Sequence, residues 1–258
     1  MQIRTPAWLL AAAILTASYS IAQTPLKPMA ADAHPSFAVA AIKPHDPTSQ
    51  RNGMGFGGDR VAIRNQSLAR LIMFTYAIHP HQIVDAPEWA ESLDYDIDAT
   101  IDTPGSPNLA QQQEMLTKLL ADRFQLKFHH EQRELPVYAI RIAKGEPRLK
   151  PAAPGESLDE DVRGNDAEPT VIFTNAAMNN LVLGMQFFLD RPVVDQTGLN
   201  GRYDFSIHFT KDETHSADPN APPGIFTAVE EQLGLKFEPT KAPVDVLVID
   251  HVEPPSAN

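Results

Sequence analysis

The sequence predicts an α+β fold built from two pseudo-repeated β-α-β-β-α-β-β units, with helices packed on one face of mainly antiparallel sheets. A segment that begins at Asn65 recurs about 110 positions later at Asn175, and such an internal period indicates one supersecondary unit used twice. Apolar residues follow helical spacing in two stretches of each copy, and residues that alternate as in strands lie between them. Helices that cover one face of a sheet give a layered α+β domain.

The positions that the two copies share are mostly apolar or turn-forming, so we interpret them as packing positions. The matched pairs are Val84-Asp85 with Val194-Asp195, Tyr95-Asp96 with Tyr203-Asp204, Leu126-Lys127-Phe128 with Leu235-Lys236-Phe237, and Pro136-Val137 with Pro243-Val244. They indicate how the chain is built more clearly than what it does.

The first unit is predicted over residues 37–144. Its first helix, at 66–78, follows from Leu68, Leu71 and Ile72, which repeat at three- and four-residue steps and form one apolar stripe. Asn65 is expected to cap this helix with its side-chain oxygen. The other expected elements are strands at 37–43, 60–64, 82–85, 94–101, 125–130 and 137–143, a helix at 110–124, and a polar, Gly-rich loop at 45–58.

The second unit is predicted over residues 170–254. Its first helix, at 176–189, carries an apolar stripe at the same phase and follows Asn175, the second expected cap. Gly234 is placed to end the next helix in the left-handed conformation. The other expected elements are strands at 192–195, 202–210, 235–238 and 244–252, and that next helix at 224–233.

The N-terminal segment has the features of a secretory signal peptide, expected over residues 1–22. A cation at Arg4 precedes a short apolar run, and Ala22 ends a small-residue cleavage site. The run is shorter than the roughly 20 residues that a permanent membrane anchor needs. We therefore expect a periplasmic or secreted protein without such an anchor; an uncleaved anchor is the alternative.

Composition also marks the segments outside the two units. Residues 23–36 are rich in proline and alanine and are expected to form a mobile lead-in. Prolines, glycines and acidic residues predict a linker or surface loop at 145–169, and prolines a further insertion at 211–223.

Charge and cysteine content narrow the possible partners. The formal net charge is −12, and an acidic exported protein repels the phosphate backbone of nucleic acids. The absence of cysteine excludes disulfides, thiol nucleophiles and cysteine metal sites. We therefore expect no nucleic-acid partner and a fold that depends on its apolar core.

Asp85 and Asp195 occupy matched positions and are the first candidates for chemistry. Two carboxylates related by the repeat could form the acid/base pair of a hydrolase. Alternatively, each accepts backbone N–H groups in the turn that follows its strand. Because turn chemistry is local and needs no second carboxylate, we expect the structural role and assign no catalytic residue.

Other acidic and histidine residues do not form a known metal motif. Asp94, Asp96 and Asp98 share one face of a strand, which is typical of a water-facing surface, and the calcium-loop spacing is missing. The histidines show no His-Glu-x-x-His motif. We expect no metal and no cofactor, while a three-ligand site assembled across the fold stays open as an alternative.

The residues predicted to bind a ligand or partner are Asp85, Trp89, Asp195, Arg202 and Phe187. Trp89 and Phe187 are the aromatic residues chosen for partner contact, although core packing is the more frequent role of such side chains. Arg202 belongs to a charged row on one face of its strand.

Five stretches carry a family resemblance: 37–44 (FAVAAIKP), 119–131 (LLADRFQLKFHHE), 134–144 (ELPVYAIRIAK), 191–205 (RPVVDQTGLNGRYDF) and 226–254. With these stretches the chain resembles a soil-associated family of exported bacterial proteins of uncharacterised function, expanded in acidobacteria. The resemblance implies export and a shared domain, and it brings no catalytic residues. That domain also occurs attached to membrane-bound sensor-type metallopeptidases, which implies sensing or binding.

A second resemblance concerns shape. Residues 171–209 followed by 225–249 resemble the short N-terminal domains of secretins and TonB-dependent receptors, which are βαβ-type modules that dock other envelope proteins. This resemblance implies an interaction role.

These observations predict an exported, non-enzymatic binding or protein-interaction module of the cell envelope, whose partner is an envelope protein or a small ligand. Concave ground between the two units is the expected site. Two alternatives stay open: an envelope hydrolase that uses Asp85 and Asp195 or a histidine cluster, and a metal-responsive binder.

Overall fold

The structure is a computed structural model that describes residues 27–155, 158–165, 167–211 and 221–255. It shows the predicted α+β fold, with helices packed against antiparallel and mixed sheets. Among the described residues the strands form three four-stranded sheets. The expected signal peptide at 1–22 lies outside the described residues, and so does most of the insertion expected at 211–223.

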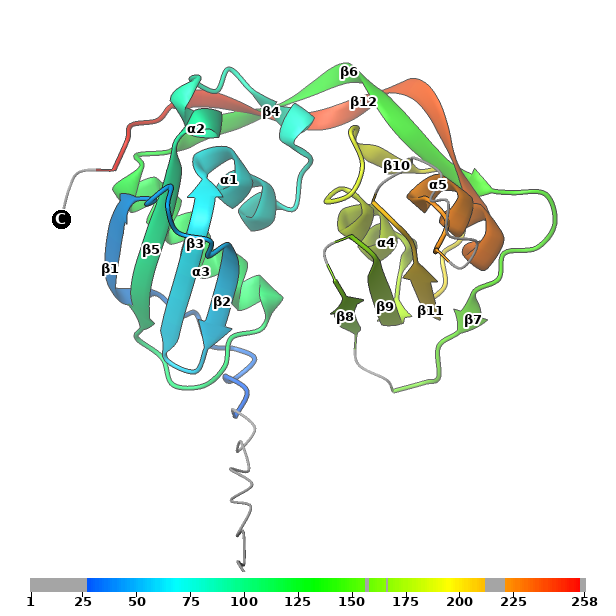
Figure 1. Ribbon diagram of the computed structural model, residues 1–258, viewed down its shortest axis with the longest axis horizontal. Helices are drawn as coiled ribbons and strands as arrows, with labels where there is room; N and C mark the ends of the chain where they lie inside the picture. The colour runs from blue at the N-terminus through cyan, green and yellow to red at the C-terminus, as the bar shows by residue number, and fades with distance from the viewer. Residues whose placement is uncertain (1–26, 156–157, 166, 212–220, 256–258) are drawn as a thin grey trace, which may run out of the picture.

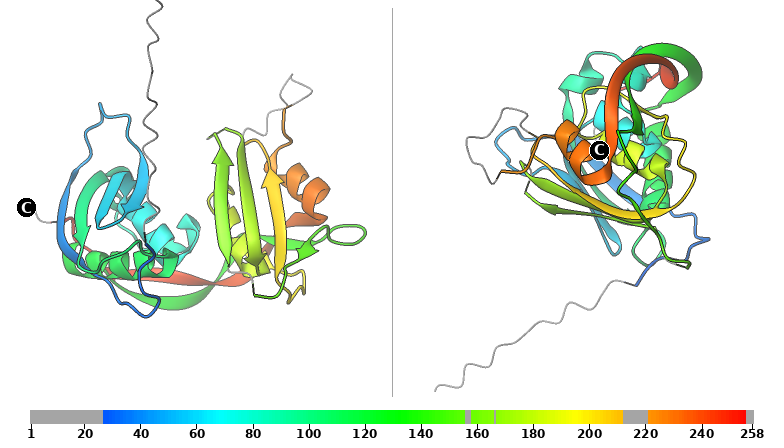
Figure 2. Two further views of the ribbon diagram at one scale, coloured as in Figure 1. Left: turned by 90° about the horizontal axis from the view of Figure 1, so that it is seen from below. Right: turned by 90° about the vertical axis from the view of Figure 1, so that its right-hand side faces the viewer.

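An antiparallel sheet in the order β1-β5-β3-β2, with its helices, forms what we call the first lobe (Figure 1). Val61 and Ile63 of β3 are buried, as predicted. The helices lie between this sheet and a long strand pair that joins the lobes (Figure 2). The elements are β1 (Phe37–Pro44), β2 (Gly53–Gly57), β3 (Arg60–Ser67), α1 (Leu68–Tyr76), the 3₁₀ turn η1 (Pro80–Gln82), α2 (Trp89–Ser92), β5 (Asp94–Ile101) and α3 (Leu109–Arg123).

A second antiparallel sheet, in the order β7-β11-β9-β8, forms the second lobe with its helices. Leu181 and Val182 of α4 are buried in its core, as the apolar stripe predicted. The elements are β7 (Lys150–Pro151), β8 (Asp159–Gly164), β9 (Pro169–Ala176), α4 (Met178–Met185), β11 (Tyr203–His208), α5 (Ile225–Ala228) and the π turn η2 (Val229–Leu233).

The strand pair that joins the lobes, called the ribbon, consists of β6 (Lys127–Ile142) and β12 (Leu235–His251). The two strands are antiparallel along almost their whole length and arch over both lobes (Figure 1). The short strands β4 (Ile83–Val84) and β10 (Val193–Asp195) add to its outer edges in parallel, which gives the order β10-β6-β12-β4.

Each strand of the ribbon contributes to the cores of both lobes. Phe128 at the start of β6 and Ile249 at the end of β12 pack in the first-lobe core. Ile140 at the end of β6 and Leu235 at the start of β12 pack in the second-lobe core. The first-lobe core therefore needs β12, which follows the second lobe in the chain. The second-lobe core needs β6, which follows the first lobe.

The prediction of four separate strands in place of β6 and β12 was wrong. Pro136, Pro239 and Pro243 lie within these strands, and proline is tolerated where its missing N–H has no neighbouring strand to pair with. β10 borders β6 only at residues 138–140, and β4 borders β12 only at 247–248. Among the described residues each of the three prolines therefore has a neighbouring strand on one side only.

Three segments expected to be irregular form ordered parts of the fold. The Gly-rich stretch within 45–58 contains β2, and the range 145–169 contains β7 and β8. In the lead-in, Met29 is buried and its N–H donates to the carbonyl of Ser106 at 2.9 Å. The described part of the lead-in is thus attached to the first lobe.

Asn65 and Asn175 do not cap helices, which corrects that prediction. The N-caps are Ser67 and Ala177. The two asparagines have left-handed φ values of 54° and 49° and lie where strand register shifts in β3 and β9. Asparagine tolerates this conformation better than most residues, and next to a helix it is easily mistaken for a cap.

The two lobes are connected in the same way, which favours the predicted repeat. Adding six to each strand number in β1-β5-β3-β2 gives β7-β11-β9-β8, the order in the second lobe. In both lobes an aspartate accepts the N–H of the left-handed asparagine: Asp96 from Asn65 at 3.2 Å, and Asp204 from Asn175 at 3.0 Å. The repeat itself stays a prediction from sequence and topology.

Candidate functional site

The two matched carboxylates, Asp85 and Asp195, have different local settings. Asp195 ends β10, and its Oδ1 accepts the backbone N–H of Thr197 at 2.8 Å and the hydroxyl of Thr197 at 2.7 Å. This is the local turn role that the sequence suggested. Asp85 follows β4, is exposed, and has a left-handed φ of 58°.

The topology separates the two carboxylates. β4 and β10 lie at opposite edges of the ribbon sheet, with β6 and β12 between them. Three strand spacings of about 4.8 Å correspond to roughly 14 Å, before the offset along the strands is counted. Carboxylate pairs in hydrolases lie about 5–9.5 Å apart. The arrangement therefore argues against an acid/base pair formed by Asp85 and Asp195.

The other three predicted residues lie at separate places. Trp89 is half-buried and packs against the first-lobe core. Arg202 donates to the backbone carbonyl of Asn175 at 2.8 Å, so it supports the register shift in β9. Phe187, just after α4, is 52% exposed, so a large part of its side chain is free for a partner.

The metal candidates have structural partners. His79 is buried, its Nε2 lies 3.1 Å from the carbonyl of Leu189, and burial lowers its pKa. Asp96 is also buried, contrary to the expected water-facing row, with its Oδ1 2.6 Å from Nδ1 of His45. Within the described ranges no group of three or more possible ligands is placed to hold a metal ion.

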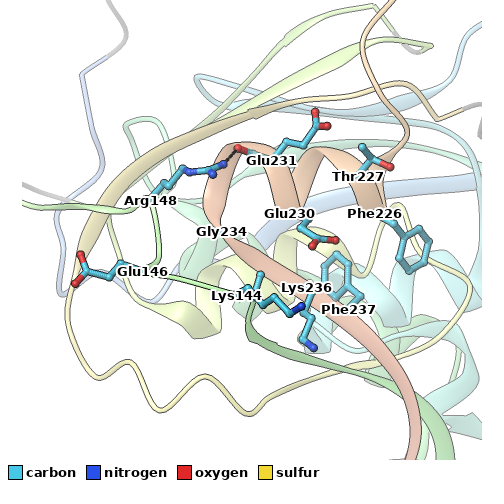
Figure 3. Close-up of a pocket in the computed structure, with 11 residues that line it drawn as sticks. Lys144, Glu146, Arg148, Phe226, Thr227, Glu230, Glu231, Gly234, Lys236 and Phe237 are labelled. Atoms are coloured by element: carbon cyan, nitrogen blue, oxygen red, sulfur yellow. Dashed lines mark hydrogen bonds between the residues drawn. The ribbon is translucent and has the colours of Figure 1, made fainter.

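A hollow of about 410 Å³ lies in the second lobe, where the chain leaves β6 and passes the end of η2 (Figure 3). Its volume falls in the range of about 300–1,000 Å³ that is typical of small-molecule sites. None of the five predicted binding residues lines it. This hollow lies within one of the two units, and a concave site between the units stays a prediction.

Backbone contacts hold the wall of this hollow in place. Ala143 donates its N–H to the carbonyl of Gly234 at 2.9 Å, and Arg148 donates its N–H to that of Leu233 at 2.8 Å. Gly234 has a left-handed φ of 67°, and a Cβ on it would lie 2.9 Å from the carbonyl oxygen of Glu146. Only glycine allows the loop to approach the helix end this closely.

Two cations of the hollow are held by neighbours. The guanidinium of Arg148 donates to the carbonyl of Glu231, and Nζ of Lys236 lies 2.5 Å from Oε1 of Glu238. These side chains are thereby oriented before any ligand arrives.

Two further charged groups are free. Lys144 and Glu230 both line the hollow, and neither side chain pairs with another residue in the part of the chain that the structure describes. Figure 3 shows both around the ring of Phe237, whereas Glu146 and Glu231 point away. The hollow therefore presents one free positive and one free negative charge.

An aromatic cluster supplies the apolar side of the hollow. The rings of Phe226 and Phe237 lie 5.7 Å apart in an edge-to-face arrangement, and Tyr138 packs against Phe226 at 5.1 Å. Such pairs prefer edge-to-face geometry at these distances. A ligand between the charges and these rings would contact both polar and apolar surface.

The sequence contained a signal for these residues in the differences between the two copies. With Leu126-Lys127-Phe128 aligned to Leu235-Lys236-Phe237, Thr117 stands opposite Phe226 and Ala121 opposite Glu230. Small side chains in the first copy are thus replaced by an aromatic ring and a carboxylate in the second. The positions that the copies share carry no trace of this change, so a prediction based on them misses the hollow.

Comparison with protein families places the chain in one of them. The family described as "Protein of unknown function (DUF3738)" matches residues 69–252, which is most of the chain. The chain belongs to the DUF3738 family. No curated protein and no solved structure matches it. In the described part of this DUF3738 chain, no helix is both long and apolar enough to cross a membrane.

Proposed function

We propose that the protein is an exported, non-enzymatic binding module of the cell envelope, with the hollow of the second lobe as its ligand site. The observation that carries this proposal is the pair of free, opposite charges on Lys144 and Glu230, set over the aromatic cluster. Ligand sites of this kind combine apolar walls with a few placed polar groups.

The chemistry of the lining suggests the class of ligand. A carboxylate would pair with Lys144, an ammonium group would pair with Glu230, and an apolar group would pack on Phe226 and Phe237. A small zwitterion such as an amino acid or the end of a short peptide has all three features.

Isothermal titration calorimetry with three probes tests this assignment. Phenylalanine has both charges, phenylalaninamide lacks the carboxylate, and phenylpropanoate lacks the ammonium group. We expect phenylalanine to bind at least about tenfold more tightly than either analogue, since hydrogen bonds to charged groups are worth about 1.5–3 kcal/mol. Equal affinities of the three probes would contradict the proposal. So would the absence of heat from every probe at about 10 mM, a concentration well above a dissociation constant of about 1 mM, which corresponds to weak binding.

Variants locate the binding to the hollow. Lys144→Met should weaken phenylalanine and leave phenylalaninamide unchanged, whereas Glu230→Gln should do the same for phenylalanine and leave phenylpropanoate unchanged. Lys127→Met is the matched control, because Lys127 corresponds to Lys236 in the first copy and does not line the hollow. The control should bind phenylalanine as the parent protein does.

Export is supported by the composition of residues 1–22 and by the resemblance to exported proteins. N-terminal sequencing of protein from the envelope fraction should begin at Gln23. Protein that retains Met1 and stays inside the cell would argue against an envelope role.

A further inference from the structure

β8 is the outer strand of the second-lobe sheet, and it pairs with β9 on one side only among the described residues. An outer strand presents unpaired N–H and C=O groups that can accept another strand. Proteins protect such edges or use them for partners. This edge contributes no residue to the hollow, so a role for it is independent of the proposed ligand site.

At the corresponding edge of the first lobe, two aromatic rings cover the helix side of the sheet. β2 is the outer strand there, and its Phe56 stacks on Phe74 of α1, with ring centroids 6.4 Å apart. In the strand pairing, Phe56 lies opposite Val61 of β3. Val162 of β8 lies opposite Val171 of β9, and Val171 is the residue of the second copy that corresponds to Val61. Val162 therefore takes the place of Phe56 in the second lobe.

The second ring is also missing in the second lobe. Phe74 follows Asn65 by nine residues, and Gly184 of α4 follows Asn175 by the same number. The positions of the aromatic pair beside the first edge are thus a valine and a glycine at the second. As a result Val162, although it is on the helix side of the sheet, is 58% exposed.

A carboxylate lies beside Gly184, the position that corresponds to Phe74. Glu160 lies opposite the buried Phe173 and so points to the helix side of the sheet. Its Oε1 lies so close to Gly184 that a Cβ there would be 3.2 Å from it. Although much of this residue is exposed, burial of its carboxyl end raises the pKa of Glu160.

Glu160 has no partner for its charge, and an exposed apolar ring follows Gly184 three residues later in the chain. No residue that the structure describes pairs with this carboxylate. Phe187, one helical turn beyond Gly184, is 52% exposed. The edge thus combines free backbone groups, an unpaired acid and exposed apolar side chains.

We propose that the free edge of β8 receives an extended, basic segment of a partner protein as an added strand, with a lysine or arginine of that segment paired to Glu160. Charge favours this partner, because β8 carries the run Asp159-Glu160-Asp161 and the whole chain has a net charge of −12. Side chains of an added strand alternate between faces. Apolar residues two positions from the cation would therefore pack beside Val162 and Phe187.

Binding of a synthetic peptide to the full chain tests this proposal. The probe is a short, fluorescent peptide in which a central lysine has valine two positions away on each side and threonine at the positions between, and the comparison peptide has the same sequence with alternate backbone nitrogens methylated. Methylation keeps the charge and removes strand pairing. We expect the probe to bind at least about tenfold more tightly by fluorescence anisotropy, and to slow hydrogen exchange at residues 159–164.

Two matched variants separate strand addition from general charge attraction. Glu160→Gln should weaken the probe by about tenfold, whereas Asp159→Asn removes the same charge from the opposite face of the strand and should have little effect. Equal effects of the two variants, or protection of amides at β2 or the ribbon instead of β8, would overturn the proposal. The proposal would also be overturned if the chain formed dimers and Val162→Lys abolished them. The strand added to β8 would then come from a second copy of the chain.

Discussion

At the scale of single residues, Asp96 shows how tertiary structure changes the role of a side chain. Alternation along β5 predicted that Asp96 would face water beside Asp94 and Asp98. The loop that carries His45 and the left-handed Asn65 cover it, and only 6% of the residue is exposed. Neither contact follows from spacing, because both partners are far from Asp96 in the sequence.

We expect Asp96→Ala to lower the free energy of unfolding by about 3 kcal/mol, since it leaves the buried His45 and the N–H of Asn65 without their acceptor. Asp204→Ala is the matched control: Asp204 likewise accepts the N–H of Asn175, but its ion-pair partner Lys150 is largely exposed, so the loss should be smaller. Urea unfolding of both variants measures the difference. Equal losses of unfolding free energy would show that the buried pair contributes no more to stability than the exposed pair.

The same residue predicts a dependence of stability on pH. Burial disfavours the charged form of Asp96, but hydrogen bonds from His45 and Asn65 outweigh burial and hold its pKa below the usual 3.8. A lowered pKa stabilises the fold above the unfolded value of about 3.9, and this stabilisation is lost as the pH falls through the folded pKa. Asp96→Asn should therefore flatten the fall in unfolding free energy below about pH 4.

At the scale of elements, the spacing of apolar residues identified the main helices. The ends of the elements depend on tertiary contacts, which this spacing does not predict. Leu68, Leu71 and Ile72 are buried on α1 as predicted. The π turn at the end of the last helix was not predicted, although Gly234 was correctly expected to end that helix in the left-handed conformation. Residues of this turn line the hollow, and the apolar spacing does not predict the turn. The residues that line the hollow could therefore be found in the sequence only by comparing the two copies.

Gly234→Ala tests how this helix end is built. An alanine in the left-handed region costs about 1–2 kcal/mol, and its Cβ would also meet the carbonyl of Glu146 at 2.9 Å. Gly198→Ala is the matched control, since Gly198 has a similar φ of 71° and open space around it. We expect the larger loss of unfolding free energy for Gly234→Ala. Equal losses would mean that the loop moves away freely.

At the scale of the whole molecule, the ribbon makes the two lobes depend on each other. The sequence indicated two similar units, but it did not show that β6 and β12 would pair along their length and serve both cores. That pairing joins residues more than 100 positions apart, such as Lys127 and His251. Local patterns specify strands, whereas the choice of partner is set by the assembled core.

A cut in the loop after β6 tests this dependence. A fragment of residues 27–147 contains the first lobe and β6 but lacks Val246, Leu247, Val248 and Ile249, which are buried on β12. Each such side chain contributes about 1.5–3 kcal/mol, so their loss rivals the 5–15 kcal/mol that stabilises a typical protein. We expect this fragment and the fragment 148–255 each to lack cooperative thermal unfolding alone and to regain it when mixed. Val246→Asp in the second fragment should prevent the recovery, because it places a charge at a fully buried position of β12. A first fragment that unfolds cooperatively alone, at the temperature of the intact chain, would show that its lobe is closed without the ribbon.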